Sequence, residues 1–374
     1  MKKFIYLCGM MLLCMNVMAQ IDPYDQNNWD CVLYDEFTNN SWNTWDNWLI
    51  SHPYGHYKAF IPEWPSGVSR GLSEHQVYQR ENCQFNNNGL LQFVSVYEGG
   101  QDNQPLQCGD YDIPPEKICD INHPSLFYST GKIETDVKYL YGYFEIKCSL
   151  PIHAGSFPAF WLYGGGSNYY NEIDIFEYSN GIALDNYYKQ FTCGIYCDNY
   201  NTNYTSYART QPILPETSTD LRQPHVFACE WLPDRVTWFV DGVVVNEELN
   251  RDHIPHHSMA LKVNYAIDNY AVPITGSNQY QPQWFGTDVM TIEYLKVLQL
   301  KTNCNSDVVI TSLSDLLMMN PSVKKTIYIE PISSLAVPNN THMTLRSVDG
   351  FEIGTGFEIN AGAQMTFIVQ ECPN

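Results

Sequence analysis

The stretch N-E-I-D-I-F-E-Y, at Asn171–Tyr178, carries three carboxylates interleaved with apolar residues. Isoleucine and phenylalanine favour β-strands, and the first residues of the stretch alternate between polar and apolar with a period of two. Glu172 and Asp174 are therefore expected on one face of a strand. Strict alternation would turn Glu177 to the apolar face, so we predict a β-bulge of one extra residue near Phe176 that returns Glu177 to the acidic face.

The charges on this strand favour a chemical role. Three carboxylates on one face repel one another and would weaken a strand that had only a structural function. No lysine or arginine stands between Leu162 and Lys189 to compensate them. Two carboxylates held close together can hydrolyse a glycosidic bond, and a third can separate their two pKa values. The alternatives are a metal site and a solvated acidic edge of a sheet.

Further segments occur in an order that resembles a known family. These segments are D-E-F at Asp35–Phe37, G-L-S-E-H-Q-V-Y-Q-R-E-N at Gly71–Asn82, S-T-G-K-I at Ser129–Ile133, Y-G-Y-F-E-I-K at Tyr141–Lys147, F-P-A-F-W-L at Phe157–Leu162, E-W-L-P-D at Glu230–Asp234, V-D-G at Val240–Gly242 and I-E-Y-L-K-V at Ile292–Val297. With the acidic motif, they resemble glycoside hydrolase family 16 in its laminarinase-like version, which has an extra residue before the last glutamate. The resemblance covers Trp29 to Leu300 and departs from the family at Phe157, where the family has tryptophan.

The fold that this resemblance implies is all-β. It is a concanavalin-A-like β-jelly-roll sandwich of two curved sheets, with the substrate cleft on the concave face. The residue pattern agrees, because helical periodicity is not convincing anywhere and many short strands are separated by turn signals. Asp241-Gly242, between two valine-rich runs, predicts a hairpin.

The resemblance also assigns roles to the three carboxylates. Glu172 is the nucleophile, Glu177 the acid/base and Asp174 the carboxylate that modulates them. A retaining pair of carboxyl groups lies about 5–5.5 Å apart. Five positions of an extended strand span roughly 16 Å at ~3.3 Å each, so the strand must bend or the side chains must converge.

Three further residues are predicted to bind substrate. Trp161, just upstream of the acidic strand, is expected to stack on a sugar ring, although it could instead pack in the core. Trp231 and Asn264 match family positions near the cleft. No cofactor and no metal are expected, since Cys193-x-x-x-Cys197 lacks a second cysteine or histidine cluster.

The predicted function is a secreted, retaining endo-β-glycanase. The segment E-x-Q-x-Y within Gly71–Asn82 favours a β-1,3-type glucan as the polysaccharide or oligosaccharide substrate. Alternatives are an endo-hydrolase of a β-galactan (agar, carrageenan or a mucin-type chain), a transglycosylase, and a non-catalytic carbohydrate-binding protein on the same fold. Loss of either end carboxylate would indicate the non-catalytic protein, and both are present.

The start of the chain predicts export. Lys2 and Lys3 precede the apolar run Phe4–Met15, and Val17-Met18-Ala19 supplies a cleavage site, so residues 1–19 are predicted to be a signal peptide of a secreted or periplasmic protein. The run is too short to span a membrane, and a lipoprotein is not expected because leucine precedes Cys14. The net charge of −21 argues against nucleic acid and anionic membranes as partners.

The chain changes character after Leu300. Residues 20–302 are predicted to be the catalytic domain, and residues 303–374 a small C-terminal β module of unknown role with a short internal repeat at Gly350–Ile359. In an exported chain, Cys304 with Cys372 and Cys108 with Cys119 are plausible disulfides. A monomer is expected.

Overall fold

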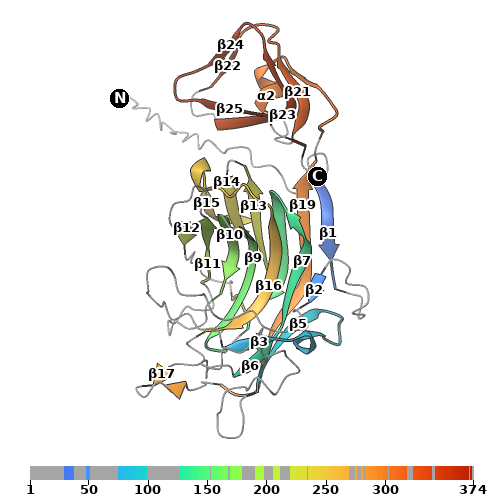
Figure 1. The fold of residues 1–374 in the computed structure, drawn as a ribbon, viewed down its shortest axis with the longest axis vertical. Helices are drawn as coiled ribbons and strands as arrows, with labels where there is room; N and C mark the ends of the chain where they lie inside the picture. Colours follow the sequence, from blue (N-terminus) through green and yellow to red (C-terminus); the bar gives the residue numbers. More distant parts are fainter. Residues whose placement is uncertain are drawn as a thin grey trace, which may run out of the picture.

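The computed structural model describes residues 29–37, 48–50, 75–98, 127–151, 153–166, 169–178, 190–197, 205–210, 220–233, 235–268, 274–275, 279–280, 284–301, 303–317, 323–338, 342–369 and 371–372. Two large sheets form the body of the molecule (Figure 1). The larger sheet contains β1 (Trp29–Asp35), β3 (Gln76–Tyr78), β4 (Cys83–Phe85), β5 (Leu91–Tyr97), β6 (Tyr128–Thr130), β8 (Gly142–Ser149), β13 (His225–Leu232), β14 (Arg235–Val240), β15 (Val243–Glu248) and β19 (Thr287–Leu300).

The second sheet carries the acidic strand. Its order is β12 (Thr205–Thr210), β11 (Thr192–Cys197), β10 (Tyr169–Glu177), β9 (Ser156–Gly166), β16 (Met259–Ile267), β7 (Lys132–Tyr139) and β2 (Trp48–Ile50), and every neighbouring pair is antiparallel. Short elements elsewhere are η2 (Arg80–Asn82), η5 (Arg251–His253), β17 (Ile274–Thr275) and β18 (Gln279–Tyr280). The expected all-β fold is therefore confirmed.

One continuous core fills the space between the two sheets. Phe160, Leu162 and Ile173 enter it from the second sheet, and Phe144 and Ile146 enter it from the larger one. On β9, Phe160 and Leu162 alternate with half-buried neighbours, so one face of this strand is apolar. The larger sheet also carries a second, smaller apolar cluster, which includes Tyr143 and Phe239. The sandwich is thus held together by burial of apolar side chains from both sheets.

Cysteines contribute to this core as reduced side chains. Cys193 and Cys197 lie buried on β11, and the Cys197 sulfur donates a hydrogen bond of 3.5 Å to the His253 carbonyl oxygen. Cys83 and Cys148 are also buried, and both are free thiols. Burial raises the pKa of the Cys83 thiol to about 12, so this group stays protonated and unreactive in the folded protein.

The hairpin predicted from Asp241-Gly242 joins β14 to β15. Asp241 has a φ of 49° and Gly242 a φ of 77°, the left-handed conformations that a type I′ turn requires at its two central residues. Asp241 also accepts a hydrogen bond from the backbone nitrogen of Val226 at 2.9 Å. The turn residues thus fix the register of the two strands.

The C-terminal module is built differently, from parallel strands. The pairs β20–β21, β21–β23, β23–β25 and β22–β24 are all parallel, with β20 (Val308–Ile310), β21 (Lys324–Ile329), β22 (Leu335–Val337), β23 (His342–Ile353), β24 (Phe357–Ile359) and β25 (Gln364–Val369). The chain therefore winds as a coil, with α2 (Leu313–Leu317) between β20 and β21. The module has its own apolar cluster, which includes Ile310, Leu316 and Leu345.

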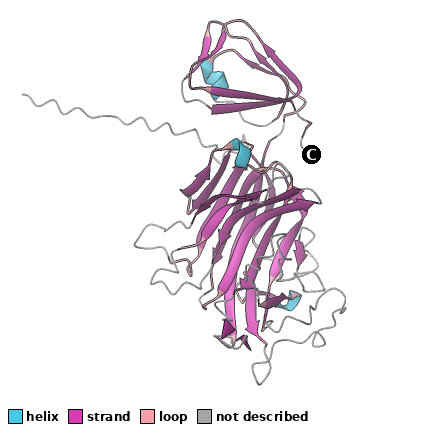
Figure 2. Cartoon of the chain, turned by 60° about the vertical axis from the view of Figure 1, so that its left-hand side comes forward, coloured by secondary structure: helices cyan, strands magenta, loops and turns pink. Residues whose placement is uncertain are grey.

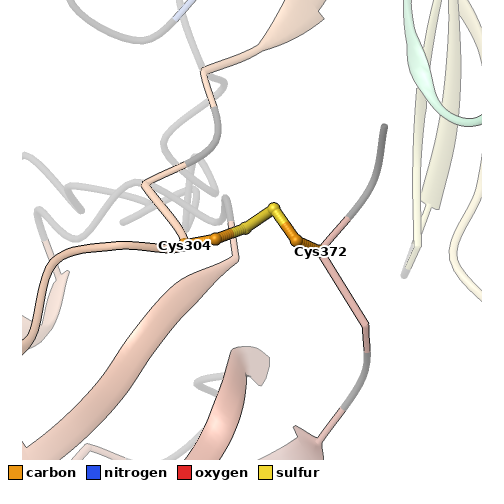
Figure 3. Close-up of a disulfide and its surroundings, with 2 residues drawn as sticks. All are labelled: Cys304 and Cys372. Atoms are coloured by element: carbon orange, nitrogen blue, oxygen red, sulfur yellow. A yellow bond between two sulfur atoms is a disulfide. The ribbon is translucent and has the colours of Figure 1, made fainter.

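A disulfide closes this coil. Cys304 precedes β20 and Cys372 follows β25, and their sulfurs are bonded with Cα atoms 5.9 Å apart (Figure 3). This confirms one predicted pair, whereas Cys108 and Cys119 lie outside the described residues. The module sits beyond the end of the sandwich at which β19 finishes (Figures 1 and 2).

Two further expectations concern the signal peptide and membrane-spanning segments. The predicted signal peptide, residues 1–19, lies outside the described residues. Among the helices of the described residues, none has the length and apolar character needed to cross a bilayer.

Candidate active site

The acidic strand β10 lies inside its sheet, between β9 and β11. In the ladder with β9, Asp174 stands opposite Trp161 and Phe176 stands opposite Phe160, so the pairing passes over Ile175. The ladder with β11 shifts between Asp174 and Glu177 as well. A bulge of one extra residue is therefore present, and the position without a partner in the β9 ladder is Ile175 rather than Phe176.

The bulge places the three carboxylates on the face of the sheet that points away from the core. Ile175 and Phe176 are adjacent in sequence, yet both are buried in the core. Because two consecutive side chains turn inward, Glu177 returns to the same outward face as Glu172 and Asp174. Glu172 and Glu177 are half-buried, and Asp174 is 2% exposed.

A tryptophan from the opposite sheet supports the bulge. Trp238 on β14 is 1% exposed, and its Nε1 donates a hydrogen bond of 2.8 Å to the backbone carbonyl oxygen of Asp174. A bulge disrupts the regular ladder at this point, and a buried carbonyl without a hydrogen bond would cost about 1–3 kcal/mol. Trp238 therefore stabilises the backbone that separates Asp174 from Glu177.

Trp161 and Asn264 lie together, Trp161 on the strand next to the acidic strand and Asn264 on the strand after that. Trp161 is half-buried on β9, and its Nε1 donates a hydrogen bond of 2.7 Å to Oδ1 of Asn264 on β16. The Asn264 amide nitrogen in turn donates to the Tyr78 hydroxyl at 3.1 Å. The Trp161 ring is thus oriented by a chain of hydrogen bonds that reaches β3.

The segment Gly71–Asn82 has a structural task that the sequence did not reveal. Tyr78 holds Asn264, and Gln76 accepts a hydrogen bond from the backbone nitrogen of Ile267 at 2.7 Å. Asn82 donates to Ser129 at 3.0 Å. The described part of the segment therefore fastens one end of the larger sheet to β16, next to the candidate site.

Charged residues on β7 and β16 extend this face, and sequence reasoning missed them. Lys262 on β16 lies 2.6 Å from the Glu134 carboxylate on β7, and Lys132 lies 3.2 Å from the same oxygen. Burial opposes ionisation of Glu134, but the two lysines outweigh it and lower the pKa of this carboxyl below its usual value. A lysine between the apolar residues Leu261 and Val263 of β16 was the available signal.

Trp231 does not belong to this face, which corrects the expectation that it binds substrate. It lies on β13 in the larger sheet, is 0% exposed, and packs in the core against Phe144 and Tyr141. Its Nε1 donates a hydrogen bond of 3.0 Å to the Pro255 carbonyl oxygen. A ring with no exposed surface cannot stack on a sugar.

The described residues contain no group of three or more His, Cys, Asp or Glu side chains arranged to hold a metal ion.

Comparison with known families decides the assignment of the chain. The family model described as glycosyl hydrolases family 16 matches residues 75–286, a span that includes the acidic strand, Trp161 and Asn264. The chain belongs to glycoside hydrolase family 16.

The individual curated relatives are distant. A β-glucanase from Rhodothermus marinus is 32% identical over 123 residues, which cover 30% of this chain and 40% of the relative. The α subunit of clotting factor G from Tachypleus tridentatus is 26% identical over 310 residues, covering 78% of this chain and 37% of the relative. The chain thus spans between about a third and a half of the length of the curated relatives that it matches.

A solved structure shares the fold. The laminarinase catalytic domain from Thermotoga maritima MSB8 aligns with a TM-score of 0.50 at 23% identity, covering 73% of this chain and 98% of that domain. At this identity the likeness establishes the architecture of the sandwich.

Proposed function

We propose that the protein is an exported, retaining endo-β-glycanase that hydrolyses a β-1,3-type glucan. The observation that carries this proposal is the bulged strand β10, which turns Glu172, Asp174 and Glu177 to one face beside the half-buried ring of Trp161. Membership of family 16 supports the reaction class.

The reaction follows a double displacement. The Glu172 carboxylate attacks the anomeric carbon while Glu177 donates a proton to the bridging oxygen, which leaves with the first product. Water then attacks the glycosyl–enzyme bond, Glu177 accepts a proton from it, and Glu172 is released as a carboxylate. Asp174, between them and largely shielded from water, separates the pKa values of its two neighbours.

The proposed substrate class is supported by the names of two relatives. One is the R. marinus β-glucanase, and the other is a glucan endo-1,3-β-glucosidase from Cryptopygus antarcticus, 30% identical over 131 residues that cover 34% of this chain and 46% of the relative. We therefore favour a β-glucan over a β-galactan. Transfer of the glycosyl group to a second sugar instead of water uses the same residues.

Hydrolysis of a panel of soluble β-1,3-glucans, β-1,3-1,4-glucans and β-galactans tests the substrate. We expect endo-cleavage of a β-1,3-containing glucan, and the first product observed by proton NMR should be the β-anomer. An initial α-anomer would show inversion and remove Glu172 as nucleophile. Cleavage of only a β-galactan, or a product mixture dominated by longer chains, would replace the proposed activity with one of the alternatives.

Two substitutions test the residues. Glu172→Gln and Glu177→Gln should each lower kcat by at least about 10²-fold with unchanged folding, since acid–base help alone contributes about 10²–10⁴-fold. The control is Glu293→Gln, which changes a half-buried glutamate paired with Lys147 in the other sheet. Activity of either site variant close to that of the control would disprove the assignment.

Export completes the proposal. The predicted signal peptide directs the protein to the periplasm or out of the cell. Its removal after Ala19 should leave a mature chain that begins at Gln20. N-terminal sequencing of the exported protein checks this, and an intact Met1 on an intracellular product would contradict it.

A further inference from the structure

Lys262 occupies an unusual position for a lysine. It lies between Leu261 and Val263, which both enter the core, so its own side chain points to the outward face of β16. It is nevertheless 2% exposed. Lysine side chains are seldom buried without a partner, and here the ammonium lies 2.6 Å from the Glu134 carboxylate.

The same ammonium also faces two aromatic rings on the neighbouring strand. Its nitrogen is 5.5 Å from the centre of the Trp161 ring and 5.3 Å from the centre of the Tyr163 ring. The two rings are themselves 5.8 Å apart and inclined by 62°. A cation within about 6 Å of an aromatic ring is attracted by it, so Lys262 holds both rings at once.

These rings border the catalytic strand. Trp161 stands opposite Asp174, and Tyr163 stands opposite Glu172 in the ladder between β9 and β10. Both rings are half-buried and therefore present part of their surface. Lys262, by contrast, has almost no surface of its own to offer a ligand.

The geometry points to Lys262 as a positioning residue for sugar binding. We propose that Lys262, fixed by Glu134, holds Trp161 and Tyr163 as a rigid platform on which a glycosyl unit next to the scissile bond stacks. Lys262 itself does not contact the sugar. This inference rests on the proposed function, because it names how that same site binds its substrate.

Replacing Lys262 with methionine isolates the effect. Methionine keeps most of the length of the side chain but has no charge, and Glu134 retains Lys132 at 3.2 Å. Lys262→Met should raise KM by about tenfold, as expected for a cation–ring interaction of ordinary strength, with kcat changed by less than about twofold. Lys147→Met is the matched control, because Lys147 forms an equally short ion pair of 2.6 Å with Glu293 in the other sheet. It should leave both constants unchanged.

A double-mutant cycle shows whether Lys262 acts through the ring. In a Trp161→Ala background, Lys262→Met should raise KM less than it does in the unmodified enzyme, because one of the two rings that Lys262 holds is already absent. The same cycle measured as the Kd of a β-1,3-linked glucose oligosaccharide, in protein carrying Glu172→Gln, separates binding from turnover. Effects of the two substitutions that simply add, or an unchanged KM in Lys262→Met alone, would overturn the proposal.

A measurement without substrate distinguishes failure of this inference from failure of the proposed function. In protein with carbon-13 lysine, the ε-methylene protons of Lys262 should resonate upfield, because the ammonium group to which they are attached lies over two rings. The signal should be absent in Lys262→Met and shift toward the position of solvated lysines in Trp161→Ala. If the upfield signal is absent from the unmodified protein, the proposed role of Lys262 in holding the two rings is refuted, even if the enzyme cleaves glucan. The presence of the signal in a protein that cleaves no glycan would refute the function alone.

Discussion

At the scale of single residues, Trp161 is half-buried on the outward face and Trp231 is buried in the core, although both were predicted to bind substrate. Trp231→Ala removes a fully buried ring and should lower the free energy of unfolding by roughly 3–5 kcal/mol, while kcat/KM per folded molecule stays close to normal. Trp161→Ala should cost less stability and raise KM. Denaturant unfolding and steady-state kinetics on both variants check this. A large KM effect in folded Trp231→Ala would restore Trp231 as a substrate-binding residue.

The sequence predicted those residues whose chemistry is visible in one short stretch. The carboxylates of β10 were predictable because their charge and spacing have few structural explanations. Trp231 was misplaced because it was assigned from a matching family position, and a tryptophan in a strand is equally compatible with the core and with an outward face. Lys262 was missed because its partners, Glu134 and Trp161, come from strands that only the folded sheet brings next to it.

At the scale of elements, the bulge in β10 depends on an indole from the opposite sheet. Trp238→Phe removes the N–H that bonds the Asp174 carbonyl and should let the bulge move relative to Glu172. A displacement of about 1 Å in a catalytic group can cost about 10²-fold, so we expect kcat to fall by about 10- to 100-fold. Kinetics and thermal unfolding measured together reveal whether activity falls more than stability.

Trp231→Phe is the matched control for this substitution. It removes an indole hydrogen bond of 3.0 Å to Pro255 from an equally buried tryptophan on the adjacent strand. Both variants should lose similar stability, and only Trp238→Phe should lose turnover. Equal loss of kcat in both would mean that general loosening of the core, rather than the bulge, explains the effect.

The bulge itself was predictable from sequence, because three carboxylates at these spacings cannot share a face of a regular strand. The parallel coil of the C-terminal module was not. Short strands such as Val308–Ile310 and Leu335–Val337 have the same composition whether they pair parallel or antiparallel. Their direction follows from the path of the chain between them, which short-range periodicity does not record.

For the whole molecule, the sandwich and the module have separate apolar clusters. None of the module residues from Ile310 to Leu345 in its cluster appears in the cluster between the two large sheets. Deleting residues 306–374 with Cys304→Ser should therefore leave hydrolysis of soluble oligosaccharides largely intact. Expression yield, thermal unfolding and activity of the shortened protein test this. Joint loss of folding and activity would show that the module is part of the catalytic fold.

The full chain carrying Cys304→Ser and Cys372→Ser is the companion variant. A disulfide that closes a loop of this length contributes about 4 kcal/mol in the chain-entropy model, so the module should unfold earlier while the sandwich does not. A shift of both transitions by the same amount would indicate that the two parts unfold as one unit.

The place of β10 inside its sheet has a consequence for how the enzyme loses activity. Local opening of a protein begins at edges and loops, whereas a strand paired on both sides exchanges its amide hydrogens only through much larger openings. β10 is bonded to β9 and β11, and it packs on the core through Ile173 and Phe176. Its amides should accordingly be among the slowest to exchange with deuterium, and those of the edge strand β12 among the faster. The temperature at which activity is lost should then coincide with the temperature of global unfolding, because the strand that carries the carboxylates opens only when the whole sandwich unfolds.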